Sequence, residues 1–474
     1  MKKPVFLKKV KRVHLTGIKG VGMTALACCL QDLGIKTSGS DVEEIFVTDE
    51  ILRQRKLPWK IGFLPEHLRS KPDLLITTGA HEGMNNPQVQ TAQKMDIPVL
   101  THAQALGKLM EEKEGISVCG VGGKTTTSSI IATILDSAHQ NPGFCIGAAS
   151  IEPLGVAGRY AGGKHFVTEA DEYANSPGVD NRPRFSFQNP KVIVVTNIEH
   201  DHPDIYPALD QAKDAFLNFF NQLPADGILI ANADNPNTMS VVKNLVGQTQ
   251  TYGFTPTADW QIINSYYGQG QTIFSLQHQG MVVDQIKIFL PGRYNVLNAS
   301  AAFAVGTFLG LPAAQIKKGL ATFGGVKRRF EFIGEVNGVK LYDDYAHHPY
   351  EIREVLAAAK KWYPQNRLVV IFQPHSYSRT KALFGQFSQA FNLAQVLIIS
   401  DIYRSAREEE DPQVSVAALV ESISRHQANV IYQPKEEQVI RYLKKETRPG
   451  DIIFTIGAGN IFQWHQNILK SLQN

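Results

Sequence analysis

The chain has 474 residues, of which 43% are hydrophobic and 19% charged, and its 48 basic and 44 acidic residues leave a formal net charge of +4. The length predicts about three domains, because a single hydrophobic core rarely grows beyond roughly 250–300 residues. The near balance of charge gives no reason to expect a nucleic acid or a membrane surface as partner. No stretch of the sequence reaches the roughly 18 apolar residues of a membrane span.

Residues 1–110 alternate strand and helix patterns. A short strand, VHLTG, leads into a glycine turn, an apolar helix over 24–34, and a second strand that ends in Asp41. The turn contains Gly17, Gly20 and Gly22. This spacing departs from the dinucleotide fingerprint Gly-x-Gly-x-x-Gly, so the turn alone is a weak signal for a nucleotide. Further strand and helix patterns follow up to about residue 110, which predicts a small Rossmann-like domain.

The remaining chain predicts two more α/β domains. Residues 111–327 begin with a strand, a glycine turn and a helix, as in P-loop ATPases, and continue with further strands and helices. Around 250–290 the sequence alternates and has few helix formers, which predicts a small, mostly antiparallel β patch. Residues 328–474 alternate strands and helices again and predict a second Rossmann-like domain with a parallel sheet. The predicted fold class is therefore α/β in three domains.

The cysteines and the N-terminus indicate the compartment. The four cysteines, Cys28, Cys29, Cys119 and Cys145, form no CxxC pair, and two of them lie in the apolar helix. We therefore expect free thiols in the core and a reducing environment. The basic N-terminus MKKPVFLKKVKRVHLTG lacks the apolar run of roughly 7–15 residues that a secretory signal needs. These features predict a cytoplasmic protein.

The stretch SVCGVGGKTTTSSI, over 117–130, predicts a strand, a glycine turn and the start of a helix. The turn contains Gly120, Gly122 and Gly123. Glycines allow the backbone to turn tightly, so that its N–H groups face an anion. The usual phosphate loop has a glycine at the position of Val118, so the match is to a shortened form, Gly-x-x-Gly-Lys-Thr-Thr.

Lys124 lies at the end of this turn, where its charge can reach the outer phosphates of a nucleotide. Thr125 offers a hydroxyl group to Mg²⁺. The helix that begins here, with Thr126 in its first turn, adds its positive end to the phosphate site. Because a strand precedes the turn and a helix follows it, the sequence predicts a site for ATP.

Two later strands end in oxygen-rich sequences. The first is TEADEY, with Glu169, Asp171 and Glu172, and the second is TNIEHDHPD, with Asn197, Glu199, Asp201 and His202. Ligands bind at the carboxyl ends of parallel strands, and Mg²⁺ prefers oxygen ligands. We therefore expect a magnesium site beside the phosphate loop. Zinc is not expected, because no cysteine and no third histidine lies close to His200 and His202 in the sequence.

Seven motifs, taken in chain order, resemble the Mur ligases of bacterial cell-wall synthesis. They are GVGGKTTT, EADEY, TNIEHDHPD, PGRYNVLNASAA, KRRFEFIGE, DDYAHHP and FQPHSYSRT. The N-terminal HLTGIKGVGMTALA and SGSD are similar to the branch that adds L-alanine to UDP-N-acetylmuramate. The resemblance implies that ATP phosphorylates a carboxylate of the nucleotide sugar, and that an amine then attacks the acyl phosphate to form an amide. We expect the protein to be a monomer or a weak homodimer.

The resemblance also implies roles for individual residues. The UDP-sugar site would be lined by Gly17, Gly20, Gly22 and Asp41. One Mg²⁺ would be held by Thr125 and Glu169, and a second by His202. The nucleotide would be contacted by Asn295 and Asn298 on the adenine side, Arg329 at the phosphates, Asp344 at the ribose, and His347 nearby. The incoming amine would be bound by His375 and Arg379, because a cation suits its carboxylate. The expected catalytic residues are Lys124, Glu169, His202, His347 and Arg379.

Three positions depart from the pattern of the alanine-adding branch. Gly122 stands where that branch has His or Asn, and Tyr294 stands where it has His. Ser376 follows FQPH in place of an arginine that helps to hold the amino acid. A serine there is similar to the recycling branch, which adds the tripeptide L-alanyl-γ-D-glutamyl-meso-diaminopimelate to the same sugar. The stretch ISDIYRSAREE instead resembles the alanine-adding branch. We expect L-alanine as the amine, with a short peptide as the alternative.

Two other classes of function remain open. A nucleotide-binding regulator without catalysis is favoured by Gly122 and Ser376, and it predicts ATP binding with no release of phosphate. A dehydrogenase built on the first βαβ unit predicts tight NAD binding, but it leaves Lys124 and the EADEY strand without a role. For the ligase, we expect Lys124→Ala to abolish turnover and to leave the fold intact, because we place the loop in a surface cleft.

Overall fold

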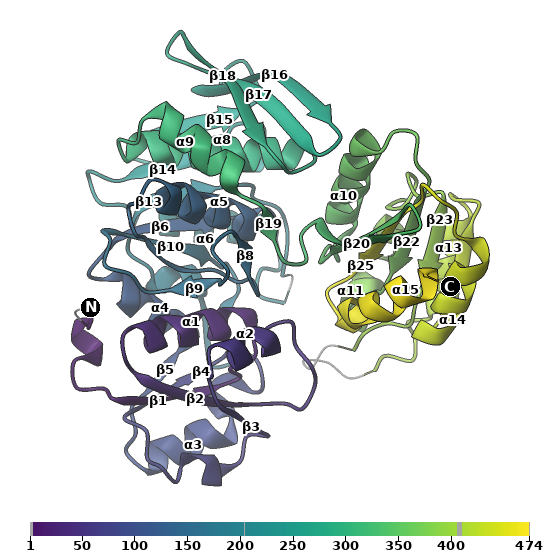
Figure 1. Ribbon diagram of the computed structural model, residues 1–474. Coiled ribbons are helices and arrows are strands. Elements are labelled where there is room, and N and C mark those ends of the chain that lie inside the picture. The colour runs from purple at the N-terminus through teal and green to yellow at the C-terminus, as the bar shows by residue number, and fades with distance from the viewer. Residues whose placement is uncertain (1–2, 203, 405–409, 474) are drawn as a thin grey trace. The chain divides into compact units, whose positions relative to one another are not determined.

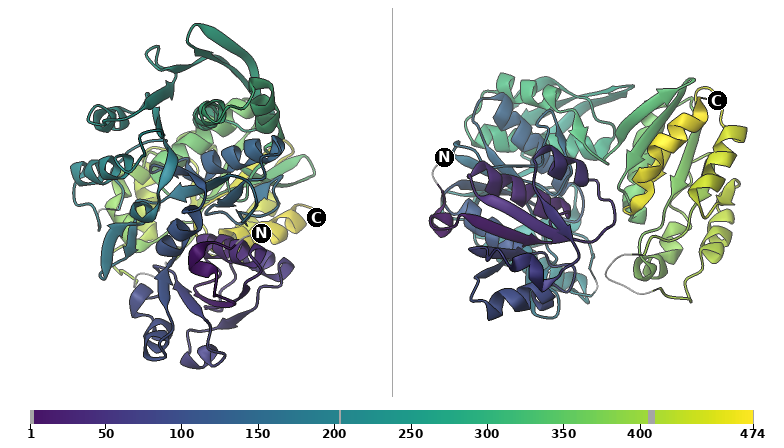
Figure 2. Two further views of the ribbon diagram at one scale, coloured as in Figure 1. Left: turned by 90° about the vertical axis from the view of Figure 1, so that its left-hand side faces the viewer. Right: turned by 60° about the horizontal axis from the view of Figure 1, so that its bottom comes forward.

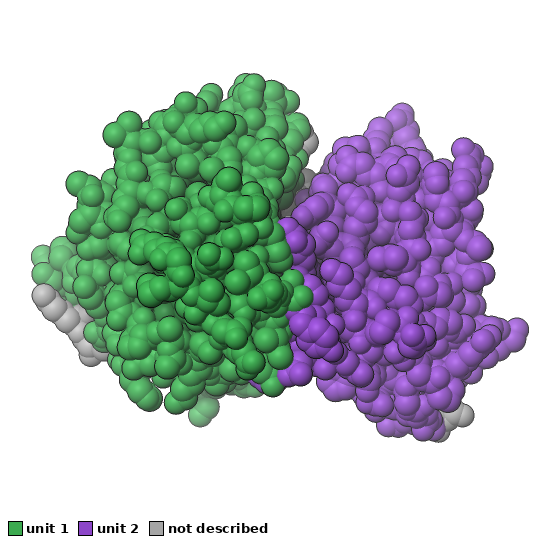
Figure 3. All heavy atoms as spheres, turned by 90° about the horizontal axis from the view of Figure 1, so that it is seen from above, with its two compact units in different colours: residues 1–265, 273–288, 295–324 green, residues 266–272, 289–294, 325–474 purple. Residues whose placement is uncertain are grey.

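The structure is a computed structural model that describes residues 3–202, 204–404 and 410–473. It divides into two compact units, shown in Figure 3. Unit 1 comprises residues 1–265, 273–288 and 295–324, and unit 2 comprises residues 266–272, 289–294 and 325–474. Within the described ranges, no helix combines the length and the apolar character that crossing a bilayer requires. Residues 405–409, which belong to the ISDIYRSAREE stretch, lie outside the described residues.

The N-terminal part of unit 1 is a parallel sheet in the order β3-β2-β1-β4-β5 (Figure 1). Its strands are β1 (Arg12–Thr16), β2 (Lys36–Asp41), β3 (Trp59–Ile61), β4 (Leu74–Thr77) and β5 (Val99–Thr101). Its helices are α1 (Val21–Asp32), α2 (Asp49–Gln54), α3 (Pro87–Lys94) and α4 (His102–Met110). The order reverses on either side of β1, and such a switch point is where doubly wound sheets bind ligands.

The second part of unit 1 is a mixed sheet in the order β18-β17-β16-β15-β14-β13-β6-β10-β7-β9, of which the tip of the β16–β17 hairpin, residues 266–272, is assigned to unit 2. Its first strands are β6 (Glu114–Cys119), β7 (Gly143–Cys145), β9 (Gly158–Arg159), β10 (His165–Ala170) and β13 (Pro190–Val195). The others are β14 (Ile228–Asn232), β15 (Thr249–Gly253), β16 (Trp260–Gly268), β17 (Gln271–His278) and β18 (Met281–Ile288). The accompanying helices are α5 (Lys124–Ser137), α6 (Leu209–Phe220), α7 (Pro236–Val242), α8 (Arg293–Phe308) and α9 (Ala313–Thr322).

Strand β6 lies between β10 and β13 and pairs with both of them in parallel. Their carboxyl ends therefore meet at one edge of the sheet. This edge carries both acidic motifs and the glycine turn of residues 120–124, called the phosphate turn below. Short two-residue connections join β16 to β17 and β17 to β18, and such connections link antiparallel strands. This is the patch predicted over 250–290, although β15 pairs with β16 in parallel.

Unit 2 is a sheet in the order β20-β21-β25-β22-β23-β24. Its strands are β20 (Glu331–Val336), β21 (Val339–Asp344), β22 (Leu368–Phe372), β23 (Val396–Ile399), β24 (Val430–Tyr432) and β25 (Ile452–Ile456). Its helices are α10 (Pro349–Trp362), α11 (Tyr377–Ala382), α12 (Phe384–Phe387), α13 (Val416–Ser424), α14 (Glu436–Glu446) and α15 (His465–Leu472). The sheet is parallel, as predicted, except that the edge strand β20 pairs with β21 in antiparallel.

Helices cover both faces of the unit 2 sheet (Figure 2). Along β22, Leu368, Val370 and Phe372 pack on one face with residues of α10, α12 and α13. Val369 and Ile371 pack on the other face with residues of α14 and α15. A strand that is buried on both faces has a continuous apolar sequence, and LVVIF is such a run. The three-domain α/β fold class predicted from the sequence is confirmed, whereas the boundaries at residues 110 and 327 stay predictions.

Candidate active site

The turn between β6 and α5 has the backbone shape of a phosphate loop. Gly120 and Gly123 have φ angles of +121° and +87°, a region that residues with a side chain rarely adopt. A Cβ atom on Gly120 would lie 2.3 Å from Thr196 Oγ1, and one on Gly123 would lie 2.7 Å from Asn298 Oδ1. Conformation and space therefore both require glycine at these two positions.

Gly122, which departs from the family pattern, is in a different situation. Its φ lies outside the left-handed region, and the described atom nearest to an added Cβ would be Asn197 Nδ2 at 3.5 Å. Its N–H donates to Asn197 Oδ1 at 3.0 Å, and its carbonyl accepts from Thr196 Oγ1 at 2.6 Å. The turn is thus held by residues that follow β13, and a side chain at position 122 is not needed to shape it.

Lys124 begins α5 and forms a buried ion pair with Glu172. Its Nζ lies 3.1 and 3.0 Å from the two carboxylate oxygens, and the two side chains are 16% and 4% exposed. Burial opposes the charge of Lys124, but the carboxylates of Glu172 and Asp171 outweigh burial and raise the pKa of Lys124. A permanent cation therefore stands at the N-terminus of α5, where a phosphate would bind, with Thr126 half-buried in the first helical turn.

Thr125 and Glu169, the pair expected to hold Mg²⁺, lie in contact. Thr125 Oγ1 donates to Glu169 Oε2 at 3.1 Å. The other carboxylate oxygen, Oε1, accepts from the N–H of Gly147 at 2.6 Å. The structure thus brings one hydroxyl and one carboxylate together directly behind the phosphate turn, and both are oxygen donors of the kind that Mg²⁺ prefers.

His202, expected as a second metal ligand, lies in a cluster with Glu172 and Asp201. One ligand atom from each residue lies within 4.8 Å of the others. The ring of His202 also lies 4.6 Å from the ring of Tyr173. Two carboxylates and one imidazole suit a divalent cation. The sequence pointed to Glu172 and Asp201 only as members of acidic strand ends, because the register that joins them to His202 is not local.

Asn295 and Asn298, on α8, are buried beside the phosphate turn. Asn298 Nδ2 donates to Asn295 Oδ1 at 3.2 Å, and the two residues are 5% and 3% exposed, respectively. The oxygen of Asn298 is the atom that a Cβ on Gly123 would meet. Asn298 therefore packs against the turn at Gly123 with Asn295 beside it, and the place of both asparagines on the adenine side stays a prediction.

The N-terminal glycine turn is closely packed. Gly17 has a φ of +79°, and a Cβ there would lie 2.5 Å from Thr78 Cγ2. Gly20 caps the N-terminus of α1, and its N–H donates to the carbonyl of Gly17 at 3.2 Å. An added Cβ on Gly22 would lie 3.1 Å from His102 Nε2. These three glycines keep the turn narrow at the switch point of the sheet.

Asp41, at the end of β2, is 1% exposed and fixes this turn. Its carboxylate accepts from the N–H of Lys19 at 2.7 Å and from that of Val42 at 2.8 Å. Burial raises the pKa of Asp41, while these N–H groups and the nearby His81, whose Nε2 lies 3.7 Å away, oppose the rise. The structure therefore gives Asp41 a role in shaping the turn, and its contact with a UDP-sugar stays a prediction.

His347, His375 and Arg379 come together within unit 2. Arg379 Nη1 lies 3.4 Å from His375 Nδ1, and the rings of His347 and His375 are 6.1 Å apart. Burial, with help from the cation of Arg379, lowers the pKa of His347 in spite of the carboxylate of Glu351. The cluster therefore offers one cation and one neutral imidazole, which fits the predicted site for the carboxylate and amine of a substrate.

The two arginines of KRRF have different surroundings. Arg328 is 6% exposed, and its Nε lies 2.9 Å from Asp343 Oδ2 while Nη1 donates to the carbonyl of Gly459 at 3.1 Å. Arg328 therefore ties β21 to the segment that follows β25. Both guanidinium groups lie over the ring of Tyr345, that of Arg328 at 5.1 Å and that of Arg329 at 5.2 Å from its centre. Arg329 is the one predicted to reach the nucleotide phosphates, and that role stays a prediction.

Asp344 is a buried carboxyl group at the end of β21. It is 3% exposed and accepts from the N–H of Phe330 and from that of Ala346, both at 2.8 Å. Burial raises the pKa of Asp344 to about 6, against the opposing effects of Arg329 and of the two N–H groups. Its predicted contact with the ATP ribose is compatible with this position, although no described contact tests it.

We expect Asp344→Asn to change how stability depends on pH. The pKa of about 6 in the folded state lies above the ordinary value of 3.8, so the folded state binds more protons between these values. The contribution of Asp344 to stability therefore falls as the pH rises from about 4 to about 6, by up to about 3 kcal/mol. Asparagine does not titrate, so the stability of the variant lacks this fall. Urea unfolding of both proteins between pH 3.5 and 7 measures the difference, and a pH-independent difference would contradict the assignment.

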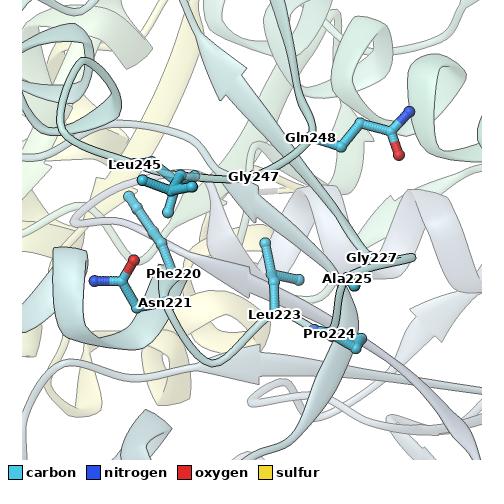
Figure 4. A pocket seen from close by; sticks show the side chains of 10 residues that line it. Phe220, Asn221, Leu223, Pro224, Ala225, Gly227, Leu245, Gly247 and Gln248 are labelled. Atoms are coloured by element: carbon cyan, nitrogen blue, oxygen red, sulfur yellow. The ribbon is translucent and has the colours of Figure 1, made fainter.

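A shallow hollow lies elsewhere in unit 1, beyond the end of α6 (Figure 4). Its lining includes Phe220, Leu223, Pro224 and Leu245. The residues that line it are uncharged and include no titratable side chain, so the hollow offers no group for acid–base or phosphate chemistry.

Comparisons with known proteins agree with the motifs. Family models match three successive parts of the chain: "Mur ligase family, catalytic domain" over residues 12–114, "Mur ligase middle domain" over 118–306, and "Mur ligase, glutamate ligase domain" over 328–459. The UDP-N-acetylmuramate–L-alanine ligase of Geobacter sp. (strain M21) is 39% identical over 468 residues, which are 98% of each chain.

Solved structures have the same fold. The UDP-N-acetylmuramate–alanine ligase of Thermotoga maritima matches with a TM-score of 0.81 at 25% identity, over 98% of this chain and 99% of that one. A murein peptide ligase from Psychrobacter arcticus 273-4 matches with a TM-score of 0.71 at 24% identity, over the same shares. The resemblance seen in the motifs is thereby confirmed over nearly the whole length. The chain belongs to the Mur ligase family.

Proposed function

We propose that this chain is an ATP-dependent ligase that joins L-alanine to UDP-N-acetylmuramate in the synthesis of peptidoglycan precursors. The observation that carries the proposal is the meeting of Lys124, Thr125, Glu169 and the Glu172–Asp201–His202 cluster at one edge of a parallel sheet. This is the arrangement that activation of a carboxylate by ATP requires. The identity of 39% to an alanine-adding ligase, over 98% of both chains, supports the choice of substrates.

The reaction has two steps. A carboxylate oxygen of the nucleotide sugar attacks the γ-phosphorus of ATP, the bond to ADP breaks, and an acyl phosphate forms. The amine nitrogen of alanine then attacks the acyl carbon, phosphate leaves with the bonding electrons, and the nitrogen loses a proton. Lys124 and the N-terminus of α5 stabilise the charge that the phosphates and the carboxylate bring together.

Other residues would hold the metal, bind the amino acid and accept a proton. Thr125, Glu169 and the Glu172–Asp201–His202 cluster would hold Mg²⁺, which when bound would neutralise part of the phosphate charge. In unit 2, Arg379 and His375 would bind the carboxylate of the amino acid. The low pKa of His347 keeps its imidazole neutral near pH 7, so it can accept the proton that the amine loses.

The test is a coupled assay of the purified protein with ATP, Mg²⁺ and UDP-N-acetylmuramate. The amine panel consists of L-alanine, the L-alanyl-γ-D-glutamyl-meso-diaminopimelate tripeptide and other amino acids. Release of phosphate that depends on both the sugar and L-alanine is the expected result. ATP binding without release for any amine would establish the regulator instead, and tight NAD binding would establish the dehydrogenase.

Addition of the tripeptide is the second candidate, and Ser376 is the observation that favours it. Ser376 has a φ of +68° and is 7% exposed. Its Oγ accepts from the N–H of Arg379 at 3.3 Å and so caps α11. The serine therefore fixes the start of the short helix that carries Arg379, whichever amine the site accepts.

We expect Ser376→Arg to raise kcat/KM for L-alanine several-fold if the missing arginine limits binding of the amino acid. Loss of the cap should at the same time destabilise the protein by about 1 kcal/mol. Ser378→Arg is the matched control, because Ser378 is exposed in the same helix and the variant adds the same charge. A kcat/KM for L-alanine that does not rise above that of the control would mean that binding of alanine does not depend on an arginine at this position.

The compartment and the oligomeric state are part of the proposal. The four cysteines are buried free thiols, which supports the expected reducing compartment, and we propose the cytoplasm. A monomer or a weak homodimer stays a prediction, and sedimentation velocity over a range of protein concentrations would measure it.

A further inference from the structure

A loop of the N-terminal sheet lies against a separate two-stranded hairpin, and both belong to unit 1. The loop, residues 78–84, follows β4, and the hairpin consists of β11 (Ala174–Ser176) and β12 (Asp180–Pro183). The N–H of Met84 donates to Ser176 Oγ at 3.2 Å. A Cβ on Gly83 would lie 2.7 Å from the same oxygen. The two parts of unit 1 are thus in close polar contact here.

The same loop packs against the glycine turn that is predicted to bind the nucleotide sugar. Thr78 is the residue that a Cβ on Gly17 would meet, at 2.5 Å. His81 Nε2 lies 3.7 Å from the carboxylate of Asp41, which holds the turn. A ligand that orders the glycine turn would therefore also restrict the position of the 78–84 loop.

Arg184, just after the hairpin, lies where this loop approaches the acidic segment formed by residues 169–172. Its Nη1 donates to Asp171 Oδ2 at 2.8 Å, and its Nε donates to the carbonyl of Ala174 at 3.2 Å. Its Nη2 is the nearest heavy atom to a Cβ built on Gly79, at 2.8 Å. One guanidinium group therefore contacts the acidic segment on one side and the 78–84 loop on the other.

The acidic segment carries the groups that face the phosphates. Glu169 contacts Thr125, and Glu172 holds Lys124 at 3.0 Å. Asp171 lies between them in the sequence and pairs with the side chain of Arg184, whose main-chain N–H also donates to the carbonyl of Tyr173 at 3.0 Å. The position of the segment relative to the loop thus depends on Arg184.

We propose that Arg184 is a positioning residue for formation of the acyl phosphate. It holds the 78–84 loop, and with it the nucleotide sugar, at a fixed place relative to the acidic segment, so that the carboxylate lies in line with the γ-phosphate. This inference rests on the proposed ligase function. A planar guanidinium with several fixed N–H groups suits the role, because it can bind a carboxylate and a carbonyl at once.

The test compares Arg184→Met, Arg184→Lys and the parent protein. We expect Arg184→Met to lower kcat about 10- to 100-fold, because a misplacement of about 1 Å between reacting groups has effects of this size. The KM for ATP should stay within about twofold, since the side chains of Lys124 and Thr125 are held by Glu172 and Glu169, which the variant keeps. Arg184→Lys should recover part of kcat, because an ammonium group can reach Asp171 but is a point charge without the fork geometry.

A second measurement isolates the first chemical step, the formation of the acyl phosphate. Hydroxylamine converts an acyl phosphate into a stable hydroxamate and phosphate, so the first step can be followed with ATP and UDP-N-acetylmuramate in the absence of an amine. We expect the yield of hydroxamate to fall in Arg184→Met in parallel with kcat, while binding of a fluorescent ATP analogue is kept. A residue with a merely structural role would lower ATP binding and hydroxamate yield together.

Arg182→Met is the matched control. Arg182 lies in β12, two residues before Arg184, is 64% exposed and pairs with Asp180 at 2.8 Å. Its kcat should equal that of the parent. Gly79→Ala keeps the arginine side chain but disturbs its contact with the loop. The φ of Gly79 lies outside the left-handed region, and the new methyl group would lie 2.8 Å from Arg184 Nη2 and 3.0 Å from the carbonyl oxygen of Asn175. We expect Gly79→Ala to lower kcat. In the double variant Gly79→Ala/Arg184→Met, the rise in the activation free energy should be smaller than the sum of the rises in the two single variants.

The outcomes separate this inference from the proposed function. If the parent releases no phosphate with UDP-N-acetylmuramate and any amine, the proposed function fails and Arg184 has no reaction to position. If the parent is active but Arg184→Met keeps kcat and hydroxamate yield within twofold, the inference is wrong and the ligase remains. Equal loss of activity in Arg182→Met would also overturn the inference, because the effect would then belong to the hairpin as a whole.

Discussion

Lys124→Met is expected to lower kcat of the ligase about 10²- to 10³-fold, the usual effect of removing one preorganised group from a site that stabilises developing charge. In the proposed reaction a triphosphate and a carboxylate must approach each other, so repulsion between anions opposes the first step. The ammonium group of Lys124 stands at the start of α5, and its raised pKa keeps it charged over the working range of pH. Methionine preserves the length of the side chain and removes only the charge and the hydrogen-bond donors.

The expectation that a Lys124 variant keeps its fold intact has to be revised in the light of the structure. Lys124 lies in a buried pair with Glu172, not on an open surface. Removing one partner of a buried pair leaves the other charge uncompensated and costs about 3–5 kcal/mol. We therefore expect Lys124→Met to unfold at lower urea concentration, and Lys124→Met/Glu172→Gln to recover much of the stability without recovering turnover.

Lys164→Met is the control for these variants. Lys164 is 68% exposed and pairs with Glu114 at 2.9 Å, at the amino end of the sheet strands and so at the edge opposite to the phosphate turn. Its turnover and stability should match those of the parent. A Lys124→Met protein with normal turnover would remove the assignment of the turn to ATP. A double variant as unstable as Lys124→Met would show that the ion pair does not determine the loss.

How far the sequence could predict this site depends on whether the contacts are local. Gly120, Gly123, Lys124 and Thr125 are close in the chain, so their chemistry and their place between a strand and a helix could be predicted directly. The pair of Lys124 with Glu172 could not, because it depends on the register of β10 against β6, in which Glu169 lies opposite Val118. Sequence patterns indicate that two strands exist, but they do not fix their register.

Residues that act through backbone contacts were the hardest to interpret from the sequence. In the sequence, Gly122 favours a regulator without catalysis, yet Thr196 and Asn197, which follow β13, bind its carbonyl and its N–H. Ser376 suggested a different amine, whereas its capping of α11 follows from a positive φ that no sequence pattern shows. Arg184 lies in a stretch without a motif, and only the approach of the 78–84 loop reveals its position.

Glu169→Gln is expected to raise the concentration of free Mg²⁺ needed for half-maximal activity about 10- to 100-fold, with MgATP held constant. Glutamine keeps the size of the side chain and an oxygen that can accept from Thr125 Oγ1 or from the N–H of Gly147, so the local packing should survive. It lacks the negative charge that makes a carboxylate a strong ligand for Mg²⁺. The loss should therefore be recovered in part at high Mg²⁺, which a loss of folding would not allow.

The matched control for this prediction is Glu114→Gln. Glu114 begins β6, at the edge of the sheet opposite to the phosphate turn, and pairs with Lys164 at 2.9 Å and with Lys191 at 3.7 Å. The Mg²⁺ titration of this variant should coincide with that of the parent. If Glu169→Gln also gave the parent's titration curve, Glu169 would not be a ligand. The remaining candidates would then be Glu172, Asp201 and His202, whose ligand atoms lie within 4.8 Å of one another, and they would have to account for the magnesium site alone.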